Sequence, residues 1–469
     1  MRRIGGAIVI VVVAAGIAPA AMAQRTSLTP CEFHSDGPTS MSMVGGQEMA
    51  SGSGGIRVDC RNRNITLIAD SGRKIGEDRV ELFGNVQYRE PTRIQLRSDL
   101  LTYFIQEERI HVRGHVVASL PSGSTLTGPE ATYLRAVPNV RLIEELTAIN
   151  NPTVTVAAKG DSGKPVSVNA TTILMRGDSL IYASRKVTIT RTDLITHSDS
   201  AFLDGRKGTE TIRLMFKPSV EGLQGRKFKL EGEVIDAYSK DRKLERVIAR
   251  GHGHATSQDM DIVADTIDLR MTNDAMERAI AWSYSGRARA TSPSQSITAD
   301  SIDVVMPKQK VRVVHAIRNA RAEAAPDTSR FRTTEQDWLR GDVVTAWFDS
   351  TTATNDTSST PPLKRILAIH SRDSAQAYYH LAPADSTTRE PAISYVRGRE
   401  IRLDFDNRKV ALVNVRDSVA GIYLEPKRDT AKAVAKPAGS GVPPKPPTAS
   451  SPVRPPRSAP VGKPEQGGS

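Results

Sequence analysis

The sequence predicts an all-β protein built from stacked hairpins, and three observations lead to this expectation. Apolar residues recur at every second position in many short segments, which is the pattern of strands with one buried face. Short charged turns separate these segments, as at residues 271–274 and 307–310. No long segment shows a helical period with capping residues at both ends. Two of the clearest copies, which begin at Asp265 and Asp300, are 35 residues apart, as expected for a repeated structural unit.

The two ends of the chain differ from its middle. Two arginines, an apolar stretch and Ala21-Met22-Ala23 follow the order of a secretory signal peptide, so residues 1–23 are expected to be cleaved on export. Residues 426–469 contain eleven prolines, and we expect a disordered tail. The Thr/Ser/Pro-rich run at 350–362 is expected to be a disordered hairpin tip.

The net charge of the protein lies mostly outside the predicted fold. Of the formal +12, the tail carries +6 (eight Lys or Arg against two acids) and the signal peptide +2, which leaves +4 for the remainder. The high positive charge therefore gives no support to a nucleic-acid partner.

The middle of the chain repeats one strand element. An acidic residue is followed by apolar residues at the second and fourth positions, which would face one side of a strand. Asp99, Asp178, Asp265 and Asp300 begin clear copies, and Asp199 begins a weaker one. Their carboxylates are expected to accept hydrogen bonds from turn amides. We expect the apolar residues to face a shared interior: Leu101, Tyr103, Leu180, Tyr182, Ile267, Leu269, Ile302, Val304, Ile401 and Leu403.

Two short motifs bear on chemistry. Cys31 and Cys60 are the only cysteines, and in an exported protein we expect them to form a structural disulfide that contributes ~3 kcal/mol. Gly177-Asp178-Ser179-Leu180 spells a block found in a family of serine hydrolases. That family also has an Asp three residues before its catalytic His, and none of the nine histidines here has one. The repeat explains the block better, so no catalytic residue, metal site or cofactor is expected.

A more specific order of residues occurs near the start of the repeats. It comprises Phe83-Gly84-Asn85-Val86, then Ser98-Asp99 and Tyr103, then Val112-Arg113-Gly114-His115-Val116. This order resembles the OstA-like, or organic-solvent-tolerance-like, family, which includes the lipopolysaccharide-transport proteins LptA and LptC and the periplasmic domain of LptD. The resemblance is close over residues 79–118 and continues in degenerate copies to 425.

This resemblance implies a fold, a function and partners. The fold would be an elongated open β-jellyroll of V-shaped, stacked hairpins, and the ten apolar residues named above would line its trough. The trough would carry lipopolysaccharide, held by its lipid A chains, through the periplasm from the inner to the outer membrane, without catalysis. The implied partners are other Lpt-type jellyroll proteins joined by edge-strand pairing, or copies of this chain joined head to tail.

The domain organisation follows from the same resemblance. A signal peptide (1–23) would precede an N-terminal segment with the disulfide (24–78), one or more consecutive jellyroll units (79–425) and the tail (426–469). Two other classes of protein stay open. One is a structural or adhesive β-solenoid whose own side chains fill its core. The other is a polysaccharide-active β-helix enzyme with acidic and basic residues clustered in a groove.

Overall fold

The structure is a computed structural model. It describes residues 31–157, 165–206, 210–223, 227–240, 243–257, 260–273, 275–326, 328, 331–349, 366–384, 388–406 and 409–426. The predicted signal peptide, the predicted hairpin tip at 350–362 and the predicted tail after residue 426 lie outside these ranges.

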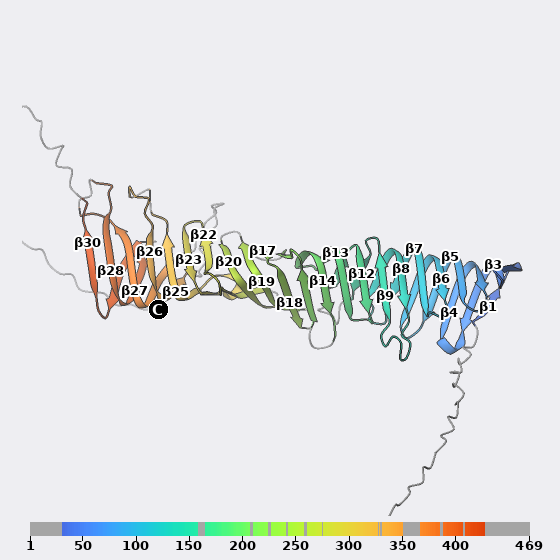
Figure 1. Ribbon diagram of the computed structural model, residues 1–469. Helices are drawn as coiled ribbons and strands as arrows, with labels where there is room; N and C mark the ends of the chain where they lie inside the picture. The colour runs from blue at the N-terminus through green and yellow to red at the C-terminus, as the bar shows by residue number, and fades with distance from the viewer. Residues whose placement is uncertain are drawn as a thin grey trace, which may run out of the picture. The chain divides into compact units, whose positions relative to one another are not determined.

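The described residues form thirty strands and two short 3₁₀ turns (Figure 1). The first strands are β1 (Glu32–Ser35), β2 (Thr39–Val44), β3 (Gln47–Cys60), β4 (Ile65–Ile75), β5 (Arg79–Glu90), β6 (Ile94–Phe104), β7 (Arg109–Ser119), β8 (Thr125–Leu134), β9 (Glu145–Ile149) and β10 (Thr153–Val156). The next are β11 (Val166–Asn169), β12 (Thr172–Arg176), β13 (Leu180–Thr190), β14 (Leu194–Asp204), β15 (Glu210–Met215), β16 (Ser219–Gly222), β17 (Phe228–Glu231), β18 (Val234–Lys240), β19 (Lys243–Ser257) and β20 (Met260–Thr272). The last are β21 (Ala275–Trp282), β22 (Ala288–Ser292), β23 (Gln295–Ala299), β24 (Ser301–Val305), β25 (Val313–Ala324), β26 (Asp337–Phe348), β27 (Ile366–Leu381), β28 (Ala392–Asp406), β29 (Lys409–Arg416) and β30 (Ala420–Leu424). The turns are η1 (Arg61–Arg63) and η2 (Pro307–Gln309). In these ranges there is no α-helix, and the pairings are antiparallel, so the all-β series of hairpins is confirmed.

Most long strands bend near their middle, so each contributes to two layers. The pairing register shifts at the bend, for example between Phe83 and Val86 in β5 and between Arg113 and Val116 in β7. We call layer A the half that contains Leu101 and layer B the half that contains Leu96, both from β6. Elsewhere two short strands replace one bent strand, as β9 and β10 do, one in each layer.

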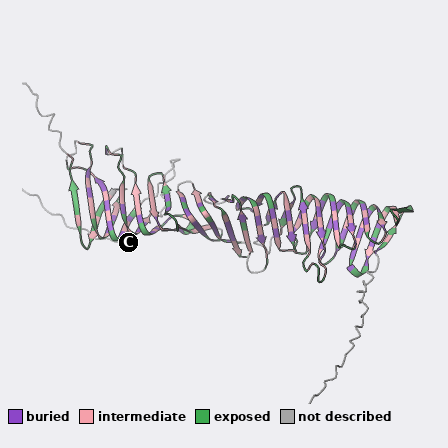
Figure 2. Ribbon diagram, viewed as in Figure 1, coloured by how far each residue is buried: buried purple, intermediate pink, exposed green. Residues whose placement is uncertain are grey.

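Cross-strand pairing in layer A continues without a break from β5 to β28. The row of directly paired residues that contains Leu101, the Leu101 row, is Leu82, Leu101, Val112, Ala131, Ala148, Ile173, Ala183, Ala201, Leu214, Ile235, Ala249, Ile267, Ala281, Ile302, Ala316, Val344, Ser371 and Ile401. None of these side chains is more than 2 % exposed. Along most of the strands, buried residues alternate with more exposed ones, as Figure 2 shows.

Layer B has a matching row that contains Leu96. It runs through Leu67, Tyr88, Leu96, Ala118, Leu126, Val154, Val168, Ile189, Thr196, Val220, Leu230, Ala255, Ile262, Ala290, Ile297, Ala322, Leu339, Ala377 and Val396. The two rows belong to one apolar cluster, so the layers share a single interior along the described chain.

The repeated acidic residues stabilise the bends. On alternate strands two consecutive residues at the bend have positive φ, such as Gly114 (75°) and His115 (43°) in β7. Asp99, on the adjacent β6, lies 2.8 Å from His115 Nδ1. A Cβ atom on Gly114 would lie 2.2 Å from the Asp99 carboxylate, so the space calls for glycine, which also adopts this positive φ without strain. Asp265 accepts hydrogen bonds from the backbone N–H groups of Tyr284 and Ser285, as expected from the sequence.

The two cysteines form a disulfide. Cys31, just before β1, is bonded to Cys60, at the end of β3, and both are 1 % exposed. The bond attaches the first described strand to the stack in addition to its backbone pairing with β3.

Candidate functional site

Eight of the ten predicted interior residues face the space between the layers. Leu101, Ile267, Ile302 and Ile401 lie in the Leu101 row. Tyr103, Leu269, Val304 and Leu403 lie in the adjacent row of layer A, the Tyr103 row. All eight are between 0 and 6 % exposed. Their burial places them in the interior.

Leu180 and Tyr182 lie on the other face, which corrects the prediction. Their neighbours Ile181 and Ala183 face inward and are 4 % and 2 % exposed. Tyr182 packs its ring on Phe202, the directly paired residue of β14, with centroids 4.8 Å apart on the outer face. A shift of one residue in a strand exchanges its two faces, so the predicted phase of β13 was wrong.

The cause of this error is the role of Asp178. It is not at a bend but in the turn between β12 and β13, where its carboxylate accepts hydrogen bonds from the backbone N–H and hydroxyl of Ser122 at 2.7 and 2.5 Å. The acid at the bend of this hairpin is Asp199 in β14, the copy that the sequence showed only weakly. Ala201 and Leu203 follow Asp199 at the second and fourth positions, and they face inward.

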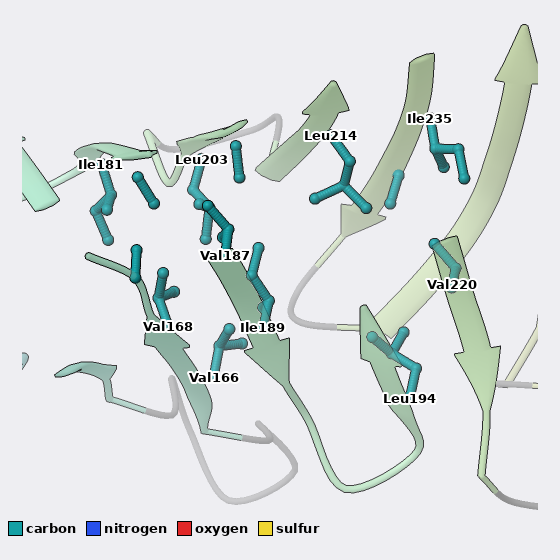
Figure 3. Close-up of a cluster of buried hydrophobic side chains, with 14 of the residues drawn as sticks. Val166, Val168, Ile181, Val187, Ile189, Leu194, Leu203, Leu214, Val220 and Ile235 are labelled. Atoms are coloured by element: carbon teal, nitrogen blue, oxygen red, sulfur yellow. The ribbon is translucent and has the colours of Figure 1, made fainter. Parts of the chain in front are cut away.

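Layer B supplies half of the interior, and the sequence analysis did not predict its residues. These residues form the Leu96 row. In β6, β14 and β20 the sequence does indicate them, because apolar residues also alternate with polar ones in the part of the strand that precedes the bend. In Figure 3, Ile181, Leu203, Leu214 and Ile235 of layer A lie opposite Val168, Ile189 and Val220 of layer B.

Between β3 and β9 large side chains fill the interior. Tyr88, Tyr103 and Tyr133 are among the largest fully buried residues. Tyr88 from layer B and Tyr133 from layer A meet edge to face, with ring centroids 6.2 Å apart. Each phenol donates to a carboxylate: Tyr88 to Glu90 and Tyr103 to Glu108, both at 3.0 Å, and Tyr133 to Glu90 at 3.5 Å. Burial is the largest cause that raises the pKa of all three phenols, so they stay protonated donors.

A buried ionic network joins the layers at the edge opposite the bends. We call these edges the lips, and the four residues Arg63, Glu90, Glu108 and Arg135 the lip network. Arg63 and Glu90 belong to the lip of layer B, and Glu108 and Arg135 to the lip of layer A. Arg63 Nε lies 2.6 Å from Glu108, and Arg135 lies 2.9 Å from Glu90 and 2.6 Å from Glu108. Their side chains are only 5–13 % exposed.

The electrostatics of the lip network favour its charged state. Burial alone would raise the pKa of Glu108, but hydrogen bonds from Arg63 and Arg135 outweigh burial and lower it. Burial likewise opposes the charge of Arg135, and the bonds to Glu90 and Glu108 raise its pKa above the ordinary value. The network therefore holds the two lips together as ion pairs at neutral pH.

Further along the chain a cavity of about 360 Å³ separates the layers. Its apolar lining includes Ile181, Leu203 and Leu214 from layer A and Ile189, Leu194 and Val220 from layer B. A second cavity of about 60 Å³ continues toward β21 and shares Leu194 and Leu244 with the first. Charged residues lie at the lips of the larger cavity, where Arg191 pairs with Asp193 and Arg206 with Asp204, each at 2.5 Å.

The interior is lined mainly by apolar side chains. In the described ranges no group of three His, Cys, Asp or Glu side chains is placed to hold a metal ion. Nor does any helix there have the length and apolar character needed to cross a bilayer. The space between the layers is suited to alkyl groups, whose transfer from water is favourable.

The fold and this interior define a class: an all-β protein of antiparallel hairpins whose two layers enclose an apolar space. No protein-family model matches the chain, and no curated protein matches it. Among solved structures, the chain is similar to LptH, the LptA-homologous periplasmic component of the lipopolysaccharide transport device of Pseudomonas aeruginosa. The two are 14 % identical with a TM-score of 0.25, and the similarity covers 28 % of this chain and 94 % of that chain.

Proposed function

We propose that the protein carries lipopolysaccharide through the periplasm, with the acyl chains of lipid A held between its two layers. The observation that supports this most is the 360 Å³ apolar cavity in an interior shared by both layers. Cavities of roughly 300–1,000 Å³ are the usual size of small-molecule sites. The signal-like residues 1–23 support a periplasmic location.

The energetics of burial support a carrier rather than an enzyme. Each CH₂ group moved from water into the interior contributes ~0.8 kcal/mol, so a few buried carbons give useful affinity. Carriage makes and breaks no covalent bond, so the protein needs no catalytic group. The acidic residues that a polysaccharide-active enzyme would need are used instead at bends, as Asp99 and Asp265 are.

Both ends of the stack have strands that could pair with a partner. Among the described strands, β1 and β2 at the first end pair only with β3, and β29 and β30 at the last end pair only with β28. Such edges recruit further strands, so we propose that Lpt-type neighbours or further copies of this chain join there by β-augmentation.

The strand directions fit a head-to-tail junction. β29 and β30 run from layer A to layer B, whereas β1 and β2 run from layer B to layer A, so an antiparallel ladder would continue across it. At the last end, Val413 belongs to the Tyr103 row and Val415 to the Leu101 row. At the first end, Met41 belongs to the Tyr103 row and Thr39 to the Leu101 row. If both rows continue across the junction, Val413 of one copy would lie beside Met41 of the next copy, and Val415 beside Thr39. Met41 and Met43 are 68 % and 69 % exposed at this end and would be covered.

The filled stretch between β3 and β9 favours the second candidate, a structural β-solenoid with its own side chains as core. Tyr88, Tyr103 and Tyr133 leave the interior there as full as in a solenoid. The two candidates differ in whether lipid enters the middle of the stack.

Site-specific photo-crosslinking in cells tests the proposal. A photoreactive residue at Leu203 or Leu269, which line the two cavities, should capture lipopolysaccharide. Outward-facing Val263 and Ile317, 46 % and 40 % exposed, are the matched controls and should not. Asp268 also faces outward but is unsuitable, because it is 1 % exposed and pairs with Arg246. Equal labelling of both sets would contradict the proposal, and no labelling at all would favour the solenoid.

A further inference from the structure

We infer that the larger cavity binds an acyl chain that carries an oxygen substituent, and that the hydroxyl of Thr196 is its polar contact. This inference rests on the proposed function and makes it more specific. It names where along the stack the lipid binds and which feature of the chain is recognised.

The hydroxyl of Thr196 is the observation that carries it. Thr196 lies in the Leu96 row of layer B, between Ile189 and Val220, and its side chain lines the larger cavity. It is 3 % exposed, and its Oγ1 has no hydrogen-bond partner in the part of the chain that the structure describes. A buried polar group without a partner costs about 1–3 kcal/mol, and few native structures retain one without a reason.

Three inward neighbours of Thr196 in layer B are apolar, and the fourth, Ser198, already donates its hydroxyl hydrogen bond to the backbone carbonyl of Ser200. Ile189 and Val220 are its directly paired residues, and Leu194 precedes it by two positions on the same face. A threonine in this setting is conspicuous, because valine has the same shape and no polar atom. A ligand oxygen that reaches this point would satisfy the hydroxyl, whereas a plain alkyl chain would leave it unpaired.

The lip network restricts the site to the middle of the stack. Between β3 and β9, a lipid chain could enter the interior only by breaking ion pairs whose partners are 5–13 % exposed. It would also have to displace the three buried tyrosines. Ser122 and Asp178 bridge the lips once more, and the cavity begins at these two residues.

The second cavity gives the site a flexible extension. Met260, Met271, Met276 and Met306 line it, four of the eleven methionines in the sequence. Unbranched thioether side chains adapt to the shape of a bound chain better than branched residues do. We therefore place the end of the acyl chain here and its oxygen-bearing part at Thr196.

The charges at the lips do not select an anionic headgroup. The described ionisable residues that line the larger cavity are Asp178, Arg191, Asp204, Arg206 and Glu210, two cations and three anions. Arg191 and Arg206 already pair with adjacent carboxylates. Recognition is therefore expected to depend on the acyl chain itself.

A displacement assay with the full chain tests the role of Thr196. A fluorescent long-chain fatty acid is bound first and then displaced by hydroxy fatty acids, with the hydroxyl at different carbons, or by the unsubstituted acid. The wild-type protein should prefer one hydroxy isomer by about fivefold or more, because that isomer pairs the buried hydroxyl. Thr196→Val should remove the preference by weakening the hydroxy isomer relative to the unsubstituted acid, and Thr196→Ser should retain the preference. An unchanged preference in Thr196→Val would overturn the inference.

A second measurement tests the location and keeps the two proposals apart. A photoreactive fatty acid bound to the wild-type chain should label peptides from residues 166–306 and not those from 47–119, which line neither cavity. Ala237→Phe, which fills the cavity, should weaken the probe about tenfold or more, while the outward Val263→Phe should not. Equal labelling of both stretches would overturn this inference but leave a lipid carrier. Absence of probe binding to the wild type would overturn the proposed function itself.

Discussion

The stretch between β3 and β9 and the stretch between β10 and β21 share the same two layers but differ in what fills them. In the first stretch the Tyr103 row contains Tyr103 and Tyr133. In the second, the same row continues through Leu203, Ile212 and Ala237. Smaller side chains on the same backbone leave the space that becomes the cavity. The same repeated strand element can thus enclose a filled core or a cavity, depending on the volume of a few inward-facing side chains.

The lip network gives the largest expected difference between the two stretches. Arg135→Met should destabilise the protein by about 3–5 kcal/mol, because it leaves Glu90 and Glu108 buried without this partner. Arg176→Met is the matched control, since Arg176 pairs with Glu145 on the exposed face and should cost about 0–1 kcal/mol. Urea unfolding of both variants measures this, and equal losses would mean that the network does not hold the lips.

The disulfide should stabilise the first stretch alone. The double variant Cys31→Ala, Cys60→Ala opens a loop with a sequence separation of 29 and should lose about 3–4 kcal/mol. Its affinity for the fluorescent fatty acid should match that of the wild type, because neither Cys31 nor Cys60 lines a cavity. If the double variant lost affinity for the fatty acid as well as stability, the two stretches would not be independent of each other.

Removal of a leucine should cost more where the interior is full. Leu82→Ala, at a 0 % exposed position in the first stretch, should destabilise by about 3–5 kcal/mol. Leu203→Ala borders the existing cavity and should cost about 2–3 kcal/mol. Chemical denaturation of the pair provides the comparison, and the reverse order would contradict the difference in packing.

The smallest of the expected effects is a loss of stability of the first stretch in acid. The pKa of Glu108 is lowered in the folded protein, so its contribution is present above the ordinary value of 4.5 and is lost as the pH falls through the lowered value. Hydrogen exchange of β6–β8 should therefore accelerate below that pH in the wild type. Glu108→Gln should show less of this pH dependence, and identical profiles would exclude Glu108 as the titrating group.

The sequence predicted the strands and one layer of the interior because a period of two directly reports a buried face. It failed at β13, where Asp178 precedes apolar residues but belongs to a turn, so that local spacing was ambiguous. The lip network had no local signal, since Arg63 and Arg135 are 72 residues apart and meet only when the layers face each other. The cavity depends on side-chain volumes summed across two layers, and no single segment contains that information.

If the middle of the stack holds lipid, the lipid should stay bound during purification and be recovered when the purified protein is extracted. The full chain, residues 1–469, would be produced in a Gram-negative host, purified without detergent and extracted with organic solvent for mass spectrometry. The wild-type protein should yield a lipid with long acyl chains in stoichiometric amounts, and Ala237→Phe purified in parallel should yield less of it. A folded wild-type protein that yields no lipid would contradict the claim.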